Sequence, residues 1–545
     1  MRPLASQRRP PNILLIVTDQ QRADTIAACG NPVIRTPALD RLVREGAVFN
    51  RAYCASPVCV SSRCALLTGL PPHASGCVDN QATPRHVDNL PKRLTAAGYQ
   101  AHGVGKMHLF PDSYGKWGFE SRDTSEEHIG DGDDYARFLV ENGFDHVIDP
   151  HGVRSEYYYL PQPSQLPDRL HHTRWCADRS IDFLNRRDRD RPFFLMTSFI
   201  KPHPPFESPV PWNRLYRPLD VDPPDVQAGD DDLWTYWNRA QNRYKYTAAG
   251  RDRLLERTRI AAYYAAISYI DYQISRMFEV LGSEMDNTLV LFTSDHGEFL
   301  GDFGCHGKRS MLDPAARVPL LARWPGRIAP GRGVDSAASL IDIVPTALRA
   351  AGCADWSVHR EGTDLVELSH SPRPDRTVYA QYQQGRFALY MAANATEKYV
   401  YSAADERAWW LLPGGANRLR EADVTGSPSF SARFEMLERD LQDRFDRDGY
   451  TVAASGNSWV CYDPPKLPES PTAGLLVQDP GELVEAVEQL PEAYRREMPP
   501  NDYLLLGTPA PFKPAPPILT PIDIRSIDRD PAPAQQAATS QTGVA

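Results

Sequence analysis

The chain contains 545 residues, of which 41% are hydrophobic and 24% are charged, and its formal net charge is -10. This length exceeds what one hydrophobic core organises, so we expect one large domain with a smaller one packed against it. A protein that binds nucleic acid usually presents a basic face, so the negative balance excludes nucleic acid as the main partner. A small anionic ligand stays compatible with the composition, because a site can be locally positive on an acidic protein.

The sequence predicts neither a membrane span nor an export signal. No stretch approaches the roughly 20 apolar residues that cross a bilayer. The apolar run Ile13–Val17 is followed by Thr18-Asp19-Gln20 and not by a small-residue cleavage site, so we interpret it as a buried strand. We therefore expect a cytoplasmic protein with no membrane partner. Nine scattered cysteines without a CxxC pair argue against a disulfide framework or a thiolate zinc site.

Four apolar runs of the buried-strand type each end at polar residues. They cover residues 12–17, 99–104, 192–200 and 287–294, and helical stretches such as 36–46 and 256–282 lie between them. Runs of this kind are typical of interior parallel strands in an α/β sheet. The residues that follow them include Asp19-Gln20, Lys106-Met107-His108, His203 and Asp295-His296. Because ligands bind outside the carboxyl ends of such strands, the four strand ends predict one shared binding site.

Beyond residue 374 the sequence changes character. Short alternating segments within 375–455 predict a small antiparallel sheet, and the amphipathic stretch 431–450 predicts a helix that covers it. Residues 456–545 form a proline-rich extension, and we expect its end, DPAPAQQAATSQTGVA, to be disordered. The predicted organisation is a large α/β domain (1–374) whose mostly parallel sheet is flanked by helices, a smaller α+β subdomain (375–455) and the extension (456–545). The extension could instead wrap the body or a neighbouring subunit, which leaves a homo-oligomer open.

The acidic residues at two strand ends favour a metal site. Asp19 and Asp295 each follow a buried strand, and each has an amide or imidazole neighbour, Gln20 and His296. Two carboxylates, an amide oxygen and a histidine make an oxygen-rich site that suits Ca²⁺, Mg²⁺ or Mn²⁺. Either aspartate alone is as well explained by a helix cap. For both together, at strand ends that the sheet brings side by side, we favour the metal site.

Cys59 is the candidate nucleophile. Ser61–Leu67 predict a helix, so Cys59 would lie at its N-terminus, where the dipole and free N–H groups favour an anion. Arg63 lies four residues further on, on the same helical face, and can hold an oxygen. The alternative is an ordinary buried thiol.

Several basic residues could converge on the same edge of the sheet. They are Arg63, Lys106, His108, His203 and Lys308. A reaction on a sulfate or phosphate ester needs such groups, because positive charge neutralises the non-bridging oxygens and a His or Lys protonates the leaving oxygen. Taken singly, each of them is better explained as a surface residue.

Six segments, in order over about residues 11–350, resemble the sulfatase family of the alkaline phosphatase superfamily. They are NILLIVTDQQRAD, TPALDRLVREGAVF, CVSSR followed by ALLTG, GYQAHGVGKMHL, KPHPPF and FTSDHGEFLGDFGCHGKRSMLDPAARVPLLARWPG. EKYVYSAADERAWWLL is similar to the C-terminal subdomain of that family. The forms GKMHL and SDHGE are most similar to choline-sulfatase-like and related bacterial sulfatases. The resemblance implies an alkaline-phosphatase-like fold and hydrolysis of a small-molecule sulfate ester.

The resemblance also implies roles for residues. The metal ligands would be Asp19, Gln20, Asp295 and His296, with calcium as the usual ion. Cys59 would be oxidised to formylglycine by a formylglycine-generating enzyme, and Arg63 would orient its hydrated form. Lys106, His108, His203 and Lys308 would hold the sulfate group or protonate the leaving alcohol. A thiolate that attacked sulfur would leave a stable ester, whereas a hydrated aldehyde can eject sulfate with its second hydroxyl group.

Two alternatives to sulfate ester hydrolysis stay open. Relatives with the same machinery act on phosphonate monoesters or phosphodiesters. The modification signature of the family has Pro or Ala two places after the cysteine, and this chain has Ser61 there. A non-catalytic protein that keeps the oxyanion pocket is therefore the second alternative.

Asn80 could lie near the site or stabilise a turn. Loop aromatics such as Tyr157, Tyr158, Tyr159, Trp212, Trp234 and Trp237 could contact the leaving group or pack.

Overall fold

The computed structural model describes residues 10–494 with gaps at 81, 83, 85–87, 110, 128–129, 131, 155–157, 243–251, 354–360, 415–418, 428–429 and 468–488. The predicted disordered end of the chain and Tyr157 lie outside the described residues. No described helix has both the length and the apolar character needed to cross a membrane.

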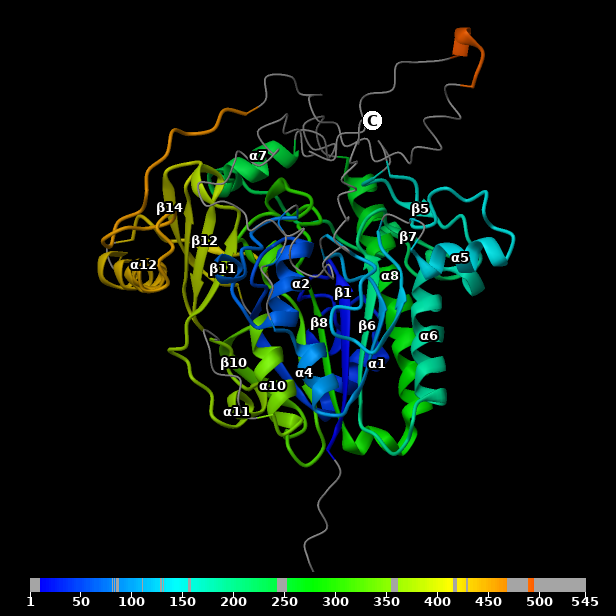
Figure 1. Ribbon diagram of the computed structural model, residues 1–545. Helices are drawn as coiled ribbons and strands as arrows, with labels where there is room; N and C mark the ends of the chain where they lie inside the picture. The colour runs from blue at the N-terminus through cyan, green and yellow to red at the C-terminus, as the bar shows by residue number, and fades with distance from the viewer. Residues whose placement is uncertain are drawn as a thin grey trace, which may run out of the picture.

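The centre of the molecule is an eight-stranded sheet with the order β10-β2-β9-β8-β1-β6-β3-β4 (Figure 1). Its strands are β1 (Asn12–Asp19), β2 (Ala47–Tyr53), β3 (Gln100–Gly105), β4 (Ser121–Thr124), β6 (Phe193–Pro202), β8 (Thr288–Ser294), β9 (Leu320–Arg323) and β10 (Arg332–Ser339). Only β9 runs antiparallel to its neighbours, β2 and β8. The four strands predicted from the sequence are confirmed, and they are the adjacent strands β8, β1, β6 and β3. Their polar ends therefore meet at one edge of the sheet.

The central strand is apolar on both sides because helices cover both faces of the sheet. Ile13, Leu15 and Val17 belong to one hydrophobic cluster, whereas Leu14 and Ile16 belong to another, and none of them is exposed. A strand buried on both faces reads as a continuous apolar run, which is what the sequence shows. One face carries α1 (Pro37–Glu45), α6 (His172–Arg186) and α8 (Arg253–Leu281), and the other carries α2 (Cys59–Thr68), α4 (Leu90–Ala96) and α10 (Ile343–Ala350).

A second, antiparallel sheet packs beside the large one. It consists of β11 (Val378–Tyr382), β12 (Leu389–Ala393), β13 (Lys398–Ser402), β14 (Arg407–Leu412) and β15 (Ala422–Asp423). Met391 and Val400 join the hydrophobic cluster of the large sheet, whereas Tyr390 and Tyr399 pack against α12 (Phe430–Arg447). The predicted small sheet with a covering helix is confirmed. Shorter elements are α3 (Pro72–Ser75), α5 (Asp134–Glu141), α7 (Tyr236–Asn242), α9 (Asp313–Ala316), α11 (Leu365–His370), β5 (Gln162–Pro163) and β7 (Glu207–Ser208).

Buried charges tie the small sheet to the large one. The Lys398 ammonium donates to Asp313 Oδ1 at 2.8 Å and to the Met311 carbonyl at 2.6 Å, and it also contacts Glu421. The side chains of Lys398, Asp313 and Glu421 are all excluded from solvent. Because a buried charge without a partner is costly, these ion pairs hold the position of the small sheet.

Candidate active site

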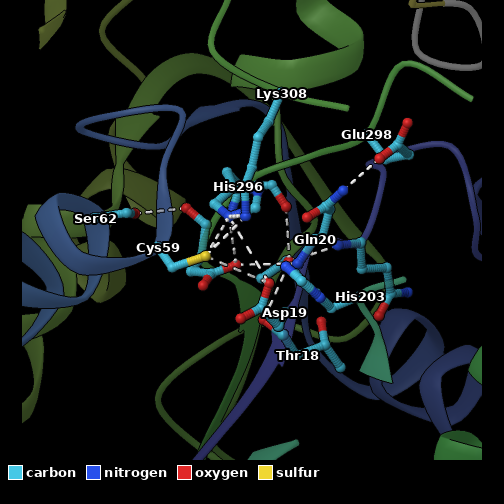
Figure 2. Close-up of polar contacts among 12 residues, drawn as sticks. Thr18, Asp19, Gln20, Cys59, Ser62, His203, His296, Glu298 and Lys308 are labelled. Carbon is cyan, nitrogen blue, oxygen red and sulfur yellow. Dashed lines mark hydrogen bonds and ion pairs between the residues drawn. The ribbon is translucent and has the colours of Figure 1, made fainter. Parts of the chain in front are cut away.

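The four strand ends form a single buried site, and Figure 2 shows residues that follow β1, β6 and β8 around Cys59. Asp19 is the last residue of β1, and Asp295 directly follows β8. The Asp295 amide donates to the Thr18 carbonyl at 3.1 Å, which joins the two strand ends. Gln20 has a positive φ of 66°, a conformation that costs energy for a residue with a side chain. Both aspartates, Gln20 and His296 are 1% exposed or less, so they lie inside the protein.

Arg63 joins the two aspartates. From α2, its Nε donates to Asp295 Oδ2 at 2.8 Å, and its Nη2 donates to Asp19 Oδ2 at 3.2 Å. Its Nη1 donates to the Lys106 carbonyl at 2.9 Å and to Ser198 Oγ at 2.8 Å. The guanidinium is 1% exposed, so all its hydrogen bonds go to protein groups. Arg63 thereby fixes the ends of β1, β3, β6 and β8 relative to one another.

Cys59 lies at the first residue of α2, which confirms its predicted place at a helix N-terminus. Its Sγ accepts from Lys308 Nζ at 2.8 Å, and it lies 3.2 Å from His296 Nε2 and 3.8 Å from Asp19 Oδ1. Burial by itself raises the pKa of the thiol. The positive charges of Lys308, Lys106 and His296 outweigh burial and hold the pKa of Cys59 well below its ordinary value. This position therefore favours an anionic group over a neutral thiol.

The two carboxylates have opposite pKa shifts. Burial works against ionisation of Asp19, but the positive charges around it, Lys106 foremost, hold its pKa below the ordinary value. Burial raises the pKa of Asp295, and the negative charge of Asp19 raises it further. A bound cation would relieve this repulsion between the carboxylates.

The donor set fits a metal ion. Ligand atoms of four residues lie within 4.8 Å of one another, namely those of Asp19, Cys59, Asp295 and His296. The Gln20 amide nitrogen donates to Glu298 and to the Tyr159 hydroxyl, as Figure 2 shows for Glu298. Gln20 Oε1 is buried and has no hydrogen-bond partner among the described residues. A buried amide oxygen of this kind is costly unless it meets a donor or a cation, so Gln20 completes an oxygen-rich site.

The predicted basic residues surround Cys59. Lys106 Nζ donates to Asp19 Oδ2 and to Glu127 Oε2, each at 2.7 Å. The side chains of His108 and His203 both lie within hydrogen-bonding reach of the Cys59 thiol. His203 Nδ1 lies 2.8 Å from the Pro204 carbonyl, so Nδ1 carries the proton and Nε2 faces the site. The structure thus brings together every site residue that the sequence singled out.

Other site residues were not predicted. Glu127 lies 3.6 Å from His203 Nε2 and contacts Lys106, and Glu126 accepts from the backbone amide of His108. Both follow the short strand β4, and an acidic pair in a loop has no sequence signal that separates it from an ordinary surface pair. Glu298 follows β8 by a few residues, so its place near the site could have been inferred from the SDHGE segment.

The loop aromatics divide into two groups. The Tyr158 hydroxyl lies 3.4 Å from His203 Nε2, and Tyr159 contacts Glu298, so these tyrosines line the site. The tryptophans pack elsewhere: Trp237 is fully buried in the core, and Trp212 contacts the rings of two tyrosines of α8.

Asn80 lies outside α2 and supports the N-terminus of that helix. Its Oδ1 accepts from the Val60 amide at 3.1 Å, which satisfies one of the free N–H groups of α2. The neighbouring Asp79 accepts from the Gln383 side chain at 2.8 Å, so the small sheet holds this turn in place. Ser61 is buried, and its hydroxyl donates to the Asp79 carbonyl at 3.1 Å. Ser61 therefore has a structural partner and does not add a polar group beside Cys59.

We expect a divalent cation to stabilise the protein. At a cation concentration a hundred times Kd, the free energy of unfolding should rise by about 2.7 kcal/mol, because only the folded chain assembles the site. Thermal denaturation after dialysis against a chelator, with Ca²⁺, Mg²⁺ or Mn²⁺ restored in turn, measures this shift.

A matched pair of variants tests the origin of the shift. Asp295→Asn should lose it, whereas Asp302→Asn should keep it, because Asp302 is paired with Arg22 at 2.6 Å outside the site. The prediction of a metal site would be contradicted if none of the three cations raised the unfolding temperature of the wild-type chain.

Comparisons with known proteins identify the family of the chain. The family model described as Sulfatase matches residues 11–353. An arylsulfatase from Clostridium perfringens is 30% identical over 471 residues, which cover 81% of this chain and 96% of that protein. The multifunctional alkaline phosphatase superfamily protein PehA from Trinickia caryophylli is 31% identical over 77% of this chain and 92% of its own length.

The fold is also found in solved structures. The phosphonate monoester hydrolase SpPMH from Silicibacter pomeroyi superimposes with a TM-score of 0.68 at 22% identity, and covers 80% of this chain and 95% of that one. At this identity the likeness concerns the fold, which is alkaline-phosphatase-like. With the family match over more than half of its length, the chain belongs to the sulfatase family of the alkaline phosphatase superfamily.

Proposed function

We propose that this sulfatase-family hydrolase cleaves small-molecule sulfate monoesters with a nucleophile made from Cys59. The observation that carries the proposal is the surroundings of Cys59, which starts a helix and faces Lys308, His296 and Asp19 within 3.8 Å. We further propose that a formylglycine-generating enzyme oxidises Cys59. Formylglycine in its hydrated form supplies two hydroxyl groups, one to attack sulfur and one to assist the release of sulfate.

The proposed metal is calcium, held by Asp19, Gln20, Asp295 and His296. Carboxylate and amide oxygens are the ligands that Ca²⁺ prefers, and Mg²⁺ and Mn²⁺ are the alternatives. A bound cation would neutralise charge on the ester oxygens and favour ionisation of the nucleophile. Arg63 was expected to orient the nucleophile. Its hydrogen bonds to both aspartates support a different emphasis, in which it holds the two carboxylates at the spacing that the ion needs.

The basic residues would have different roles in the reaction. Lys106 and Lys308 place positive charge beside Cys59, where they would neutralise the sulfate oxygens. His203 has its Nδ1 proton engaged by the Pro204 carbonyl, so its imidazolium form, which carries a second proton on Nε2, can give that Nε2 proton to the leaving alcohol. Burial lowers the pKa of His203, and the negative charge of Glu127 acts in the opposite direction and favours the imidazolium. His108 also reaches the Cys59 thiol and would bind a sulfate oxygen.

A phosphonate monoester or phosphodiester hydrolase is the second candidate. It is supported by the likeness to SpPMH and by the relative described as multifunctional. The reacting atom, sulfur or phosphorus, separates the two candidates, because a sulfate monoester and a phosphodiester carry the same single negative charge. Rates on an aryl sulfate and on an aryl phosphodiester with the same leaving group decide between them, and a much faster diester reaction would reverse our ranking.

A non-catalytic oxyanion-binding protein is the third candidate. This candidate was suggested by Ser61, which departs from the modification signature of the family. The hydroxyl of Ser61 donates to the Asp79 carbonyl and does not add a polar group beside Cys59. This candidate predicts an unmodified Cys59 and anion binding without turnover.

We further propose domain boundaries near residues 374 and 455 and a cytoplasmic location, which the sequence predicts. The sequence leaves the oligomeric state open, and a homo-oligomer could use the C-terminal extension.

We expect the peptide that contains Cys59 to be lighter than its cysteine form and to react with hydrazides. Trypsin cleaves after Arg51 and Arg63, so the peptide 52–63 also contains Cys54, which serves as an internal reference for an unmodified thiol. Mass spectrometry of protein purified from its native host measures the conversion. Cys59→Ala should abolish turnover of aryl sulfates, and turnover that survives this substitution would contradict a nucleophile at Cys59.

We expect His203→Ala and Lys308→Ala to differ in their dependence on the leaving group. Loss of a proton donor slows a poor leaving group most, so His203→Ala should lower kcat on an alkyl sulfate by at least about a hundredfold and on a 4-nitrophenyl sulfate by less than about tenfold. Lys308→Ala removes the positive charge that neutralises the sulfate oxygens. It should lower the rates on both substrates by a similar factor, about a hundredfold or more.

The comparison is made by measuring kcat for both variants on a series of sulfates whose alcohols span a range of pKa. Equal slopes of log kcat against leaving-group pKa for His203→Ala and the wild type would exclude His203 as the proton donor. His73→Ala is a suitable control, because His73 is a buried histidine that pairs with Asp448 outside the site.

A further inference from the structure

A pocket of about 430 Å³ lies on the face of the sheet that carries α1. Its walls come from the 3₁₀ turn Ala27–Cys29, from α1, and from the strands β2, β9 and β10. None of its lining residues belongs to the candidate active site. Its volume falls within the range of roughly 300 to 1,000 Å³ that is typical of small-molecule sites.

The pocket is positively charged. Arg44, Arg317 and Arg332 line it, and no aspartate or glutamate does. This is unusual for a chain whose formal net charge is -10. Arg317 is 3% exposed, so its charge acts in a medium of low dielectric constant. Cys29 also lines the pocket: burial and the Asp40 carboxylate raise the pKa of its thiol to about 11, whereas Arg317 lowers it.

Three acidic groups near the pocket have partners of their own. Asp40 accepts from the Ala28 amide at 2.8 Å, and Asp335 accepts from the Asn50 side chain at 2.8 Å. Asp313 lies 3.6 Å from Arg317 Nη1 and also accepts from Lys398 at 2.8 Å. None of these three carboxylates lines the pocket.

The rest of the wall is apolar. It is lined by Ile26, Val43, Val48, Phe49, Val318 and Leu320. An inorganic anion would leave this surface in contact with water, whereas an organic body would cover it and gain hydrophobic free energy.

We propose that this pocket binds a small amphiphilic anion, in which an apolar ring or chain carries one carboxylate, sulfonate or phosphate group. The anionic group would pair with the arginines, where a guanidinium can donate two parallel hydrogen bonds. The apolar body would lie against the strands β2 and β9. The pocket is a second ligand site, and its occupation does not depend on the chemistry proposed for Cys59.

The probe for this site is 8-anilinonaphthalene-1-sulfonate, an aromatic sulfonate that fluoresces when it leaves water. Fluorescence titration of the full-length protein should show one saturable site, both in the wild type and in Cys59→Ala. The double variant Arg44→Met/Arg332→Met removes the two exposed arginines and should raise Kd by about tenfold or more. Arg41→Met on the same helix is the matched control, because Arg41 pairs with Glu45 and does not line the pocket.

A second variant fills the pocket without changing charge. A Cβ added at Gly333 would meet no atom closer than 3.6 Å, so Gly333→Leu should fold normally and block the site. Sulfatase activity should be unchanged in Gly333→Leu and in the arginine double variant. The bound probe should also slow the alkylation of Cys29, measured by mass spectrometry, and leave the exposed Cys461 unaffected.

Three outcomes would overturn the proposal. Unchanged probe binding in Gly333→Leu and in the arginine double variant would place the probe elsewhere. Displacement of the probe by inorganic sulfate in the wild type but not in Cys59→Ala would place it in the active site. Binding that weakens as protein concentration rises, together with a dimer in sedimentation, would assign the pocket to a second copy of the chain.

Discussion

The guanidinium of Arg63 lies between the carboxylates of Asp19 and Asp295, and the arrangement of the site depends on this contact. Both carboxylates are fully buried. Two negative charges that are shielded from water are tolerated only if positive groups pair with them, and here Arg63 pairs with both. Arg63 also bonds the main chain of Lys106 and the side chain of Ser198. One side chain on α2 thus sets the relative positions of four strand ends and of Cys59, one turn earlier on the same helix.

The site alternates positive and negative groups, and this explains how so many charges stay buried. Lys106 lies between Asp19 and Glu127, and Lys308 lies beside Cys59 and His296. Gln20, whose buried Oε1 has no hydrogen-bond partner among the described residues, is next to Asp19 in the chain, and the pKa values of Asp19 and Asp295 are shifted in opposite directions. An oxygen-rich pocket with these properties is arranged for a cation and an anion together.

The small sheet contributes to the site although it supplies none of the residues that contact Cys59. Its Gln383 donates to Asp79, and the next residue, Asn80, accepts from an amide at the start of α2. Lys398 ties the same sheet to Asp313 of the large domain. Gln383 and Asp79 are 304 residues apart in the sequence, so this contact joins distant segments of the chain. The C-terminal part of the chain therefore stabilises the geometry of a site built from the N-terminal part.

The sequence was sufficient for the features that depend on local patterns. Strands buried on both faces read as continuous apolar runs, so β1, β3, β6 and β8 could be predicted together with the polar residues at their ends. The rule that ligands bind at the carboxyl ends of parallel strands then grouped Asp19, His203 and Asp295 before any contact was known. The helix that begins at Cys59 was also predictable from its own segment.

Only the tertiary structure decided the features that depend on how loops pack. Glu127 lies in a loop without periodicity, Gln383 directly follows β11, and nothing in their neighbours indicates that they meet Lys106 and Asp79. The same is true of the arginine-lined pocket, whose walls come from five segments between residues 23 and 333. The physical reason is that hydrophobic periodicity reports burial of a residue within its own element. The pairing of buried charges is determined by the distances between elements, which only the packed chain defines.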